Sequence, residues 1–130
     1  MHEVLRDYYQ KLKNDGFEHA GRIEGADISF ELSGEVSPGC FNTDDYVGLN
    51  ICLSNDLITD IKHQCISDPI NNVAIEIICD LAKGKTLQEA LQITEDSILQ
   101  FLGCEDDTMR AKAAAILVML HKEINEYVKG

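Results

Sequence analysis

The sequence predicts one α+β domain: an N-terminal helix, a three-stranded antiparallel sheet, and C-terminal helices packed on one sheet face. Two observations predict this order. Apolar and polar residues alternate between residues 27 and 63, as in strands with one buried face, and apolar residues follow helical spacing on either side of that region. With 130 residues and no visible linker or repeat, we expect residues 1–130 to form a single domain that can bury its own core.

The first half of the chain contains a helix and the three strands. Apolar side chains recur on one helical face over residues 2–13, and Asn14-Asp15-Gly16 ends that helix. The turn Ser54-Asn55-Asp56 joins the last two strands into an antiparallel hairpin. Alternation predicts the strands over three segments: 27–33, 46–53 and 57–63.

The second half is helical. Helical periodicity begins at Asp68 and stops near Lys83-Gly84. Thr86 and Glu89 have the spacing of a capping box and begin a short helix. Thr94 caps another helix, and the last helix is predicted over about residues 107–127.

Composition excludes several classes of function. The net charge is −12, with 23 acidic against 11 basic residues, which argues against nucleic-acid binding and fits basic partners. No apolar run is long enough for a membrane span, and no signal peptide is visible, so we expect a cytoplasmic protein. The five cysteines are too scattered for a disulfide framework and include no CxxC pair, so we expect free thiols.

Cys40 lies in the polar turn "SGEVSPGCFNTDDY", where there is little apolar packing to bury a thiol. The neighbouring carboxylates Glu35, Asp44 and Asp45 would raise the pKa of a free thiol, whereas a bound cation deprotonates a coordinating thiol. This environment favours a metal ligand over a catalytic nucleophile. We therefore expect a protein that is not an enzyme.

The predicted hairpin brings a second cysteine to the same end of the sheet. Cys40 precedes the second strand and Cys65 follows the third, so both fall at one end of the antiparallel pair. Thiolates, carboxylates and imidazole together suit zinc or iron. The candidate metal ligands are Cys40, Asp44, His63, Cys65 and Asp68.

The remaining cysteines and histidines have simpler interpretations. Cys52 and Cys79 are expected to be core packing, and Cys104 a bystander at a helix end. His19 and His121 are expected at the surface. Cys65 is as compatible with an ordinary loop residue as with a ligand.

Three segments resemble the IscU/NifU-type iron–sulfur cluster assembly scaffold family: "LRDYYQKLKNDG", "SPGC" and "AKGKTLQEAL". The resemblance covers nearly the whole chain and implies the IscU/SufE-like fold. It also implies a scaffold that binds iron, zinc or a labile iron–sulfur cluster for transfer to acceptor proteins. A cysteine desulfurase is the implied partner, and the implied cluster-binding residues are Cys40 and Cys65.

The chain departs from the family pattern at three positions. The family has Cys-Gly-Asp where this chain has Cys40-Phe41-Asn42, with Asp44 two positions later. An ungapped count puts Asp68 at the second cysteine, three residues after Cys65, and puts the family's His-Cys pair on Arg110 and Ala111. The third cysteine is therefore missing, whereas a cluster normally takes four protein ligands.

A sulfur acceptor of the SufE kind is the alternative function. Proteins of that kind share the fold and carry a persulfide on one loop cysteine, here Cys40. The segment "SDPINNVAIEII" is mildly similar to SufE, but "KGKTLQEAL" favours the scaffold family. The expected oligomeric state is a monomer or weak homo-oligomer.

Overall fold

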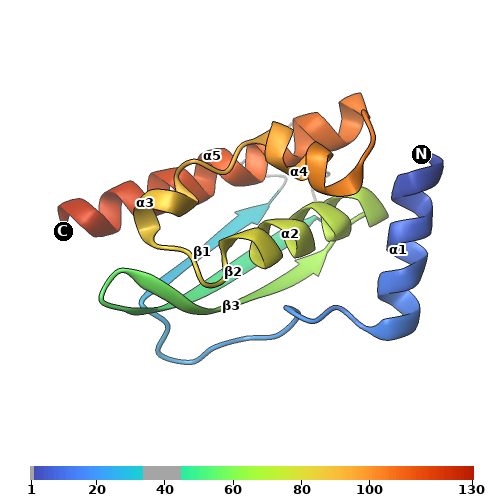
Figure 1. The fold of residues 1–130 in the computed structure, drawn as a ribbon. Coiled ribbons are helices and arrows are strands. Elements are labelled where there is room, and N and C mark those ends of the chain that lie inside the picture. The colour runs from blue at the N-terminus through green and yellow to red at the C-terminus, as the bar shows by residue number, and fades with distance from the viewer. Residues whose placement is uncertain (1, 34–44) are drawn as a thin grey trace.

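The computed structural model describes residues 2–33 and 45–130, and its elements follow the predicted order (Figure 1). A three-stranded antiparallel sheet, ordered β1-β2-β3, has its helices on one face. The elements are α1 (Glu3–Asp15), β1 (Ile28–Ser33), β2 (Tyr46–Ser54), β3 (Leu57–Ile66), α2 (Pro69–Ala82), α3 (Leu87–Ala90), α4 (Glu95–Leu102) and α5 (Asp107–Lys129).

Strands β2 and β3 form the predicted antiparallel hairpin, joined by a turn at Asn55 and Asp56. Asn55 and Asp56 have φ values of 51° and 69°, and this left-handed pair gives the turn a twist that matches the strands. β3 continues to Ile66, three residues beyond its predicted end. Cys65 therefore lies inside β3, paired with Val47, and not in the loop that follows.

The core lies between the sheet and helices α2 and α5. Alternate strand residues face the helices and are buried, as the sequence predicts. α2 contacts β3 on one side and α5 and α4 on others, which explains why it is buried almost all round. Its fully buried side chains include Val73, Ala74, Ile75, Ile77, Ile78 and Cys79.

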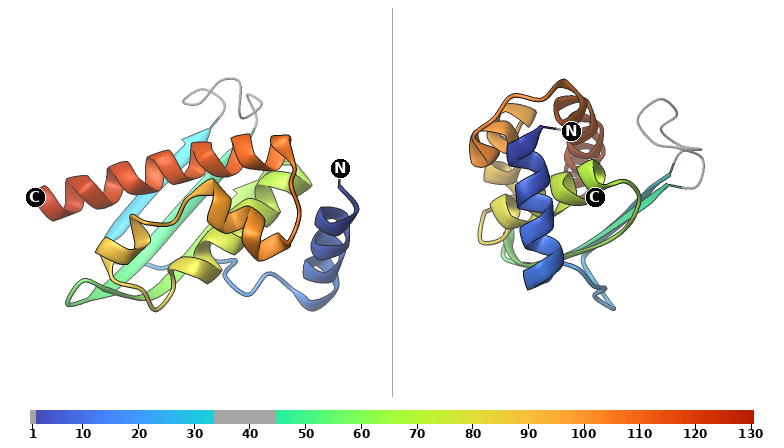
Figure 2. Two further views of the ribbon diagram at one scale, coloured as in Figure 1. Left: turned by 45° about the horizontal axis from the view of Figure 1, so that its top comes forward. Right: turned by 90° about the vertical axis from the view of Figure 1, so that its right-hand side faces the viewer.

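The segment after α1 covers the outer edge of β3. Ala20 forms a parallel bridge with His63, and the Gly21 N–H donates to the His63 carbonyl at 2.8 Å. The His63 N–H in turn donates to the His19 carbonyl. The edge strand is thereby paired with a loop, which protects it from other chains. Figures 1 and 2 show this loop beside β3, with α1 at one end of the molecule.

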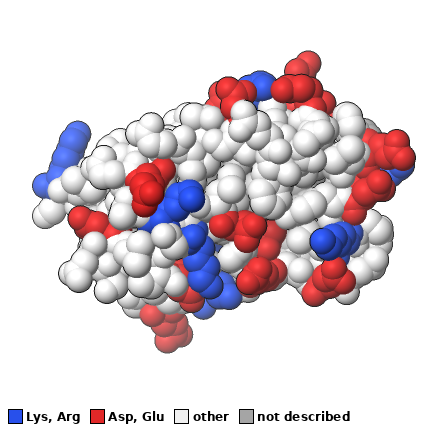
Figure 3. Space-filling model, viewed as in Figure 1, with Lys and Arg blue, Asp and Glu red and all other residues white. Residues whose placement is uncertain are grey.

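The predicted fold is confirmed, with helix and strand ends displaced by a few residues. None of the helices in the described part of the chain is long and apolar enough to cross a membrane. Acidic groups with some basic side chains among them are spread over the face in Figure 3.

Candidate metal site at the end of the sheet

The predicted thiol site maps to the end of the sheet where β1 finishes and β2 begins. The register pairs Ser33 with Tyr46 and Tyr46 with Ile66, so Cys65 lies beside this end. Cys40 and Asp44 lie outside the described residues. Because Cys40 is separated from Asp45 by only a short stretch of chain, the two Cα atoms are at most about 18 Å apart.

The Cys65 thiol is half-buried and surrounded by charge. Burial, then Asp68 and Asp45, raise its pKa to about 12, while Lys112 acts in the opposite direction. At neutral pH the thiol is therefore protonated. A metal that binds it must displace that proton, so binding is coupled to pH.

Asp68 lies at the N-terminus of α2, where it has two roles. Its Oδ1 accepts the Asn71 N–H at 2.8 Å, which caps the helix, and Pro69 follows in the first turn. Its Oδ2 is 2.7 Å from the Lys112 Nζ. Asp68 therefore contacts both the α2 N-terminus and a cationic side chain of α5.

Lys112, on α5, is a residue that the sequence reasoning missed. The family resemblance predicts Arg110 and Ala111 at this site. Arg110 instead turns to Asp96 at 2.6 Å and Glu105 at 3.1 Å, and Ala111 is exposed. Helical spacing could have indicated that Lys112 faces the domain, because residue 112 shares a helix face with the buried Met109 and Ile116.

The other cysteines give a mixed outcome. Cys79 is fully buried in the core, as expected. The expectation for Cys52 was wrong: it is half-buried on the sheet face away from the helices, because Leu49 and Ile51 occupy the inward positions of β2. Cys104 is half-buried just after α4, consistent with a bystander.

Two histidines, His19 and His63, are buried in the domain. His63 is buried, and its Nε2 lies 2.8 Å from Glu76 Oε1, so its described contacts do not join it to Cys65. His19 is only 2% exposed, although it was expected at the surface. The edge pairing of residues 19–21 with β3 buries it, and no periodicity in the sequence indicates that pairing. His121 is half-buried.

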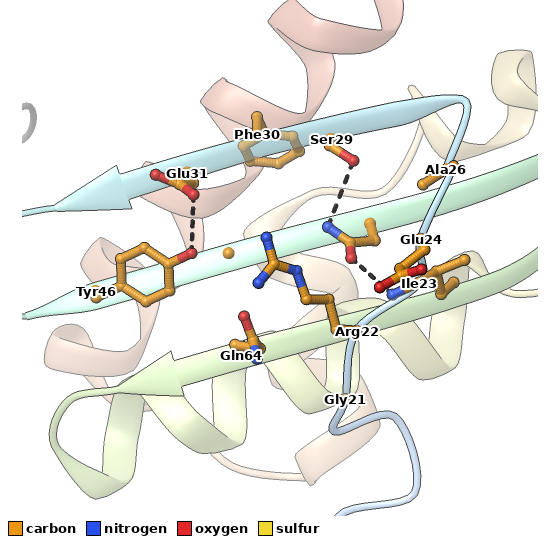
Figure 4. Close-up of a pocket in the computed structure, with 13 residues that line it drawn as sticks. Gly21, Arg22, Ile23, Glu24, Ala26, Ser29, Phe30, Glu31, Tyr46 and Gln64 are labelled. Carbon is orange, nitrogen blue, oxygen red and sulfur yellow. Dashed lines mark hydrogen bonds between the residues drawn. The ribbon is translucent and has the colours of Figure 1, made fainter.

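A hollow of about 610 Å³ lies on the sheet face away from the helices, under residues 21–26 (Figure 4). Several of its polar groups contact one another. Asn50 Oδ1 accepts the Ile23 N–H at 2.8 Å, and the Tyr46 hydroxyl donates to Glu31 at 3.0 Å. The Asn50 bond holds the loop on the sheet, and the Tyr46 bond joins β2 to β1. Cys65 faces the opposite side of the sheet.

Fold and site together define a small α+β domain with a thiol and carboxylates gathered at one end of an antiparallel sheet. The chain matches the NifU-like N-terminal domain family over residues 2–129 and belongs to that family.

Two relatives from Archaeoglobus fulgidus are similar to the chain: the iron–sulfur cluster assembly scaffold proteins IscU 1 and IscU 2. Each is 31% identical over 97 residues, which is 75% of this chain. The match spans 56% of each relative, so the chain corresponds to about half their length.

Solved structures share the fold. One is described as an iron–sulfur cluster assembly scaffold for the SUF system, from Fervidobacterium islandicum; it has a TM-score of 0.57 and 22% identity, covering 99% of this chain and 85% of that one. Another is the N-terminal part of a nitrogen-fixing NifU-like protein from Brucella abortus, with a TM-score of 0.60 and 11% identity, covering 98% and 91%. At these identities the likeness concerns the fold alone.

Proposed function

We propose that this protein is an iron–sulfur cluster assembly scaffold that receives iron or a labile cluster at the Cys65 end of the sheet and passes it to acceptor proteins. Cys65 and Asp68 supply ligands from the described part of the site. Cys40 and Asp44 supply the others from the segment between β1 and β2. Family membership and the scaffold relatives support this function.

The electrostatic surroundings of Cys65 are the main support for a metal or cluster site at this end of the sheet. The Cys65 thiol, the Asp68 carboxylate and the Asp45 carboxylate interact electrostatically where the segment bearing Cys40 joins β2. The buried Asn71 adds an amide oxygen, Oδ1, which has no hydrogen-bond partner among the described residues. Thiolates and oxygen donors together suit iron or zinc.

Lys112 occupies the place of the metal cation beside Asp68 when no metal is bound. In the metal-free protein its ammonium neutralises Asp68 at 2.7 Å. An arriving cation replaces that charge, Asp68 turns to the metal, and Cys65 releases its proton. Two thiolates with carboxylates hold a cluster less firmly than the four cysteines usual for such clusters, which suits cargo that must leave. The proposed partners are a cysteine desulfurase, as sulfur source, and cluster acceptors.

Anaerobic reconstitution with iron and sulfide tests this function. Wild type should develop visible cluster absorption that fades rapidly in air. Cys40→Ser and Cys65→Ser should each reduce the bound iron per chain at least severalfold, because each removes a thiolate from the set. Cys52→Ser is the matched control, since Cys52 is also half-buried but lies on the other sheet face.

Equal iron loading of Cys65→Ser and Cys52→Ser would contradict the proposed site. A second assay separates the sulfur-acceptor alternative. If incubation with a cysteine desulfurase and labelled cysteine puts sulfur on Cys40, and wild type holds no iron after reconstitution, the protein is a sulfur carrier and not a scaffold.

A further inference from the structure

A second group of metal-ligating side chains lies between the end of α1 and the C-terminal half of α2. Glu18, His19 and Asp80 each offer one ligand atom, and these atoms all lie within 4.8 Å of one another. Asp68 and Asp80 are about 18 Å apart along α2, at a rise of 1.5 Å per residue. This group is therefore separate from the Cys65 end.

His19 is the member that distinguishes this group from an ordinary acidic surface. The residue is 2% exposed, its Nε2 lies 3.2 Å from Asp80 Oδ1, and its Nδ1 has no hydrogen-bond partner among the described residues. A buried imidazole nitrogen without a partner is costly, and most buried polar atoms have one. The ring therefore contacts the Asp80 carboxylate through Nε2, and its other nitrogen is left without a hydrogen bond among the described residues.

Glu76 holds His19 in place from beneath. Its buried carboxylate accepts the His19 backbone N–H, at 3.3 Å to Oε1 and 3.4 Å to Oε2. Its Oε1 is also bonded to His63 Nε2. An oriented ligand supported by a further layer of hydrogen bonds is the usual construction of a protein metal site.

The space beside this group is a hollow of about 160 Å³ between α1 and α2. Carboxylates dominate its walls, with Lys11 the one basic side chain among the lining residues. Burial and then the charges of Asp80 and Glu76 raise the pKa of Tyr8, another wall residue, to about 12. The acidic lining residues are Asp15, Glu18, Glu76 and Asp80.

We propose that Glu18, His19 and Asp80 form a second metal site, which binds one divalent transition-metal ion such as Mn²⁺, Fe²⁺ or Zn²⁺. One imidazole and two carboxylates are ligands that these ions accept, and they contain no thiol. The bound ion joins the segment after α1 to α2, so it stabilises the docking of α1 on the domain. Binding to the folded state alone also raises stability by mass action.

Titration of the full chain with Mn²⁺, followed by the electron paramagnetic resonance of free Mn²⁺, tests this site. Mn²⁺ favours oxygen and nitrogen ligands over thiols, so the cysteines of the Cys65 end add little to its binding. Wild type should bind one Mn²⁺ per chain. Asp80→Asn and Glu18→Gln, both at exposed positions, should each weaken binding at least tenfold without unfolding the protein.

Two controls make the result specific. Glu126→Gln removes an exposed carboxylate on α5 and should leave Mn²⁺ affinity unchanged, which excludes a general effect of net charge. Cys65→Ser should also leave it unchanged, although it reduces cluster loading, so this proposal and the scaffold function fail independently. In NMR spectra, substoichiometric Mn²⁺ should broaden the His19 ring signals before those of His121.

Equal weakening by Asp80→Asn and Glu126→Gln would overturn the proposal, because it would indicate diffuse attraction to an acidic surface. Unbroadened His19 signals at one equivalent of Mn²⁺ would overturn it as well. This second readout does not depend on any variant and so holds even if a substitution disturbs the fold.

Discussion

Two carboxylates of the α2 region, Asp68 and Glu76, pair with side chains from other elements in contrasting environments. At the N-terminal end, Asp68 pairs with Lys112, and their side chains are 36% and 15% exposed. In the C-terminal half, Glu76 pairs with His63, and these side chains are only 5% and 3% exposed. The first pair is within reach of water and of an incoming ion, and the second is sealed inside the domain.

The difference in exposure implies different roles: the Asp68–Lys112 pair can exchange its cation, whereas the Glu76–His63 pair stabilises the fold. A partly exposed ion pair contributes little to stability and can be exchanged for another cation at low cost. A buried pair is strongly destabilising when one member is removed, because the other is left without compensation. We therefore expect substitutions at Asp68 to act mainly on cargo and substitutions at Glu76 to act mainly on the fold.

The largest expected effect comes from Glu76→Ala. The change leaves the His63 ring nitrogen and the His19 N–H without their acceptor and opens a cavity beneath α2. We expect the free energy of unfolding to fall by about 3 kcal/mol, measured by urea denaturation. Glu126→Ala, at an exposed position, should change it by less than about 0.5 kcal/mol.

Equal stability of Glu76→Ala and Glu126→Ala would contradict the expected difference, because it would mean that the buried Glu76 carboxylate does not stabilise the fold. Alternatively, the loss of stability could be confined to α1, visible as faster hydrogen exchange in that helix with unchanged exchange in the core. That pattern would assign the Glu76 contacts to docking of the N-terminal segment.

A smaller loss is expected at the other end of α2. Asp68→Ala removes the side chain that caps the helix, so stability should fall by about 1 kcal/mol. Asp68→Asn keeps a good capping side chain, so it should remain within about 0.5 kcal/mol of wild type. Thermal and urea unfolding of the two variants measure the difference. If both variants lose as much stability as Glu76→Ala, Asp68 is as important for the fold as Glu76.

Sequence periodicity predicted the fold because each element satisfies its own local requirement. The alternation in β1 and β2, the left-handed turn at Asn55-Asp56, and the Thr86–Glu89 capping box all act over a few residues. The Cys65 end followed from strand direction, which the hairpin determines.

The sites themselves depend on contacts between residues far apart in the chain. Lys112 reaches Asp68 across the packing of α5 on α2. His19 is buried by its pairing with the edge of β3, and Glu76 stands in a helix whose apolar pattern gives no sign of a carboxylate acceptor. Local patterns carry no information about such tertiary pairings, so His19 was assigned to the surface.

The smallest expected effect concerns the reactivity of Cys65 toward iodoacetamide in the metal-free protein. Asp68 raises the pKa of this thiol and Lys112 lowers it. Asp68→Asn should therefore speed alkylation of Cys65 severalfold at pH 8, and Lys112→Met should slow it, because the thiolate is the reacting form.

The pH dependence of Cys65 alkylation is a separate test that the thiolate is the reacting form. With a pKa of about 12, the thiolate fraction of Cys65 rises about tenfold for each pH unit between 7 and 10, and its alkylation rate should rise with it. Peptide mapping by mass spectrometry measures this rate, with the fully buried Cys79 as the unlabelled reference. Iron loading should respond to Asp68→Asn in the opposite direction, since the change frees the thiol but removes a ligand. Alkylation that changes in the same direction in both variants would show that access, and not charge, controls Cys65, and the exchange of Lys112 for a metal would lose its electrostatic basis.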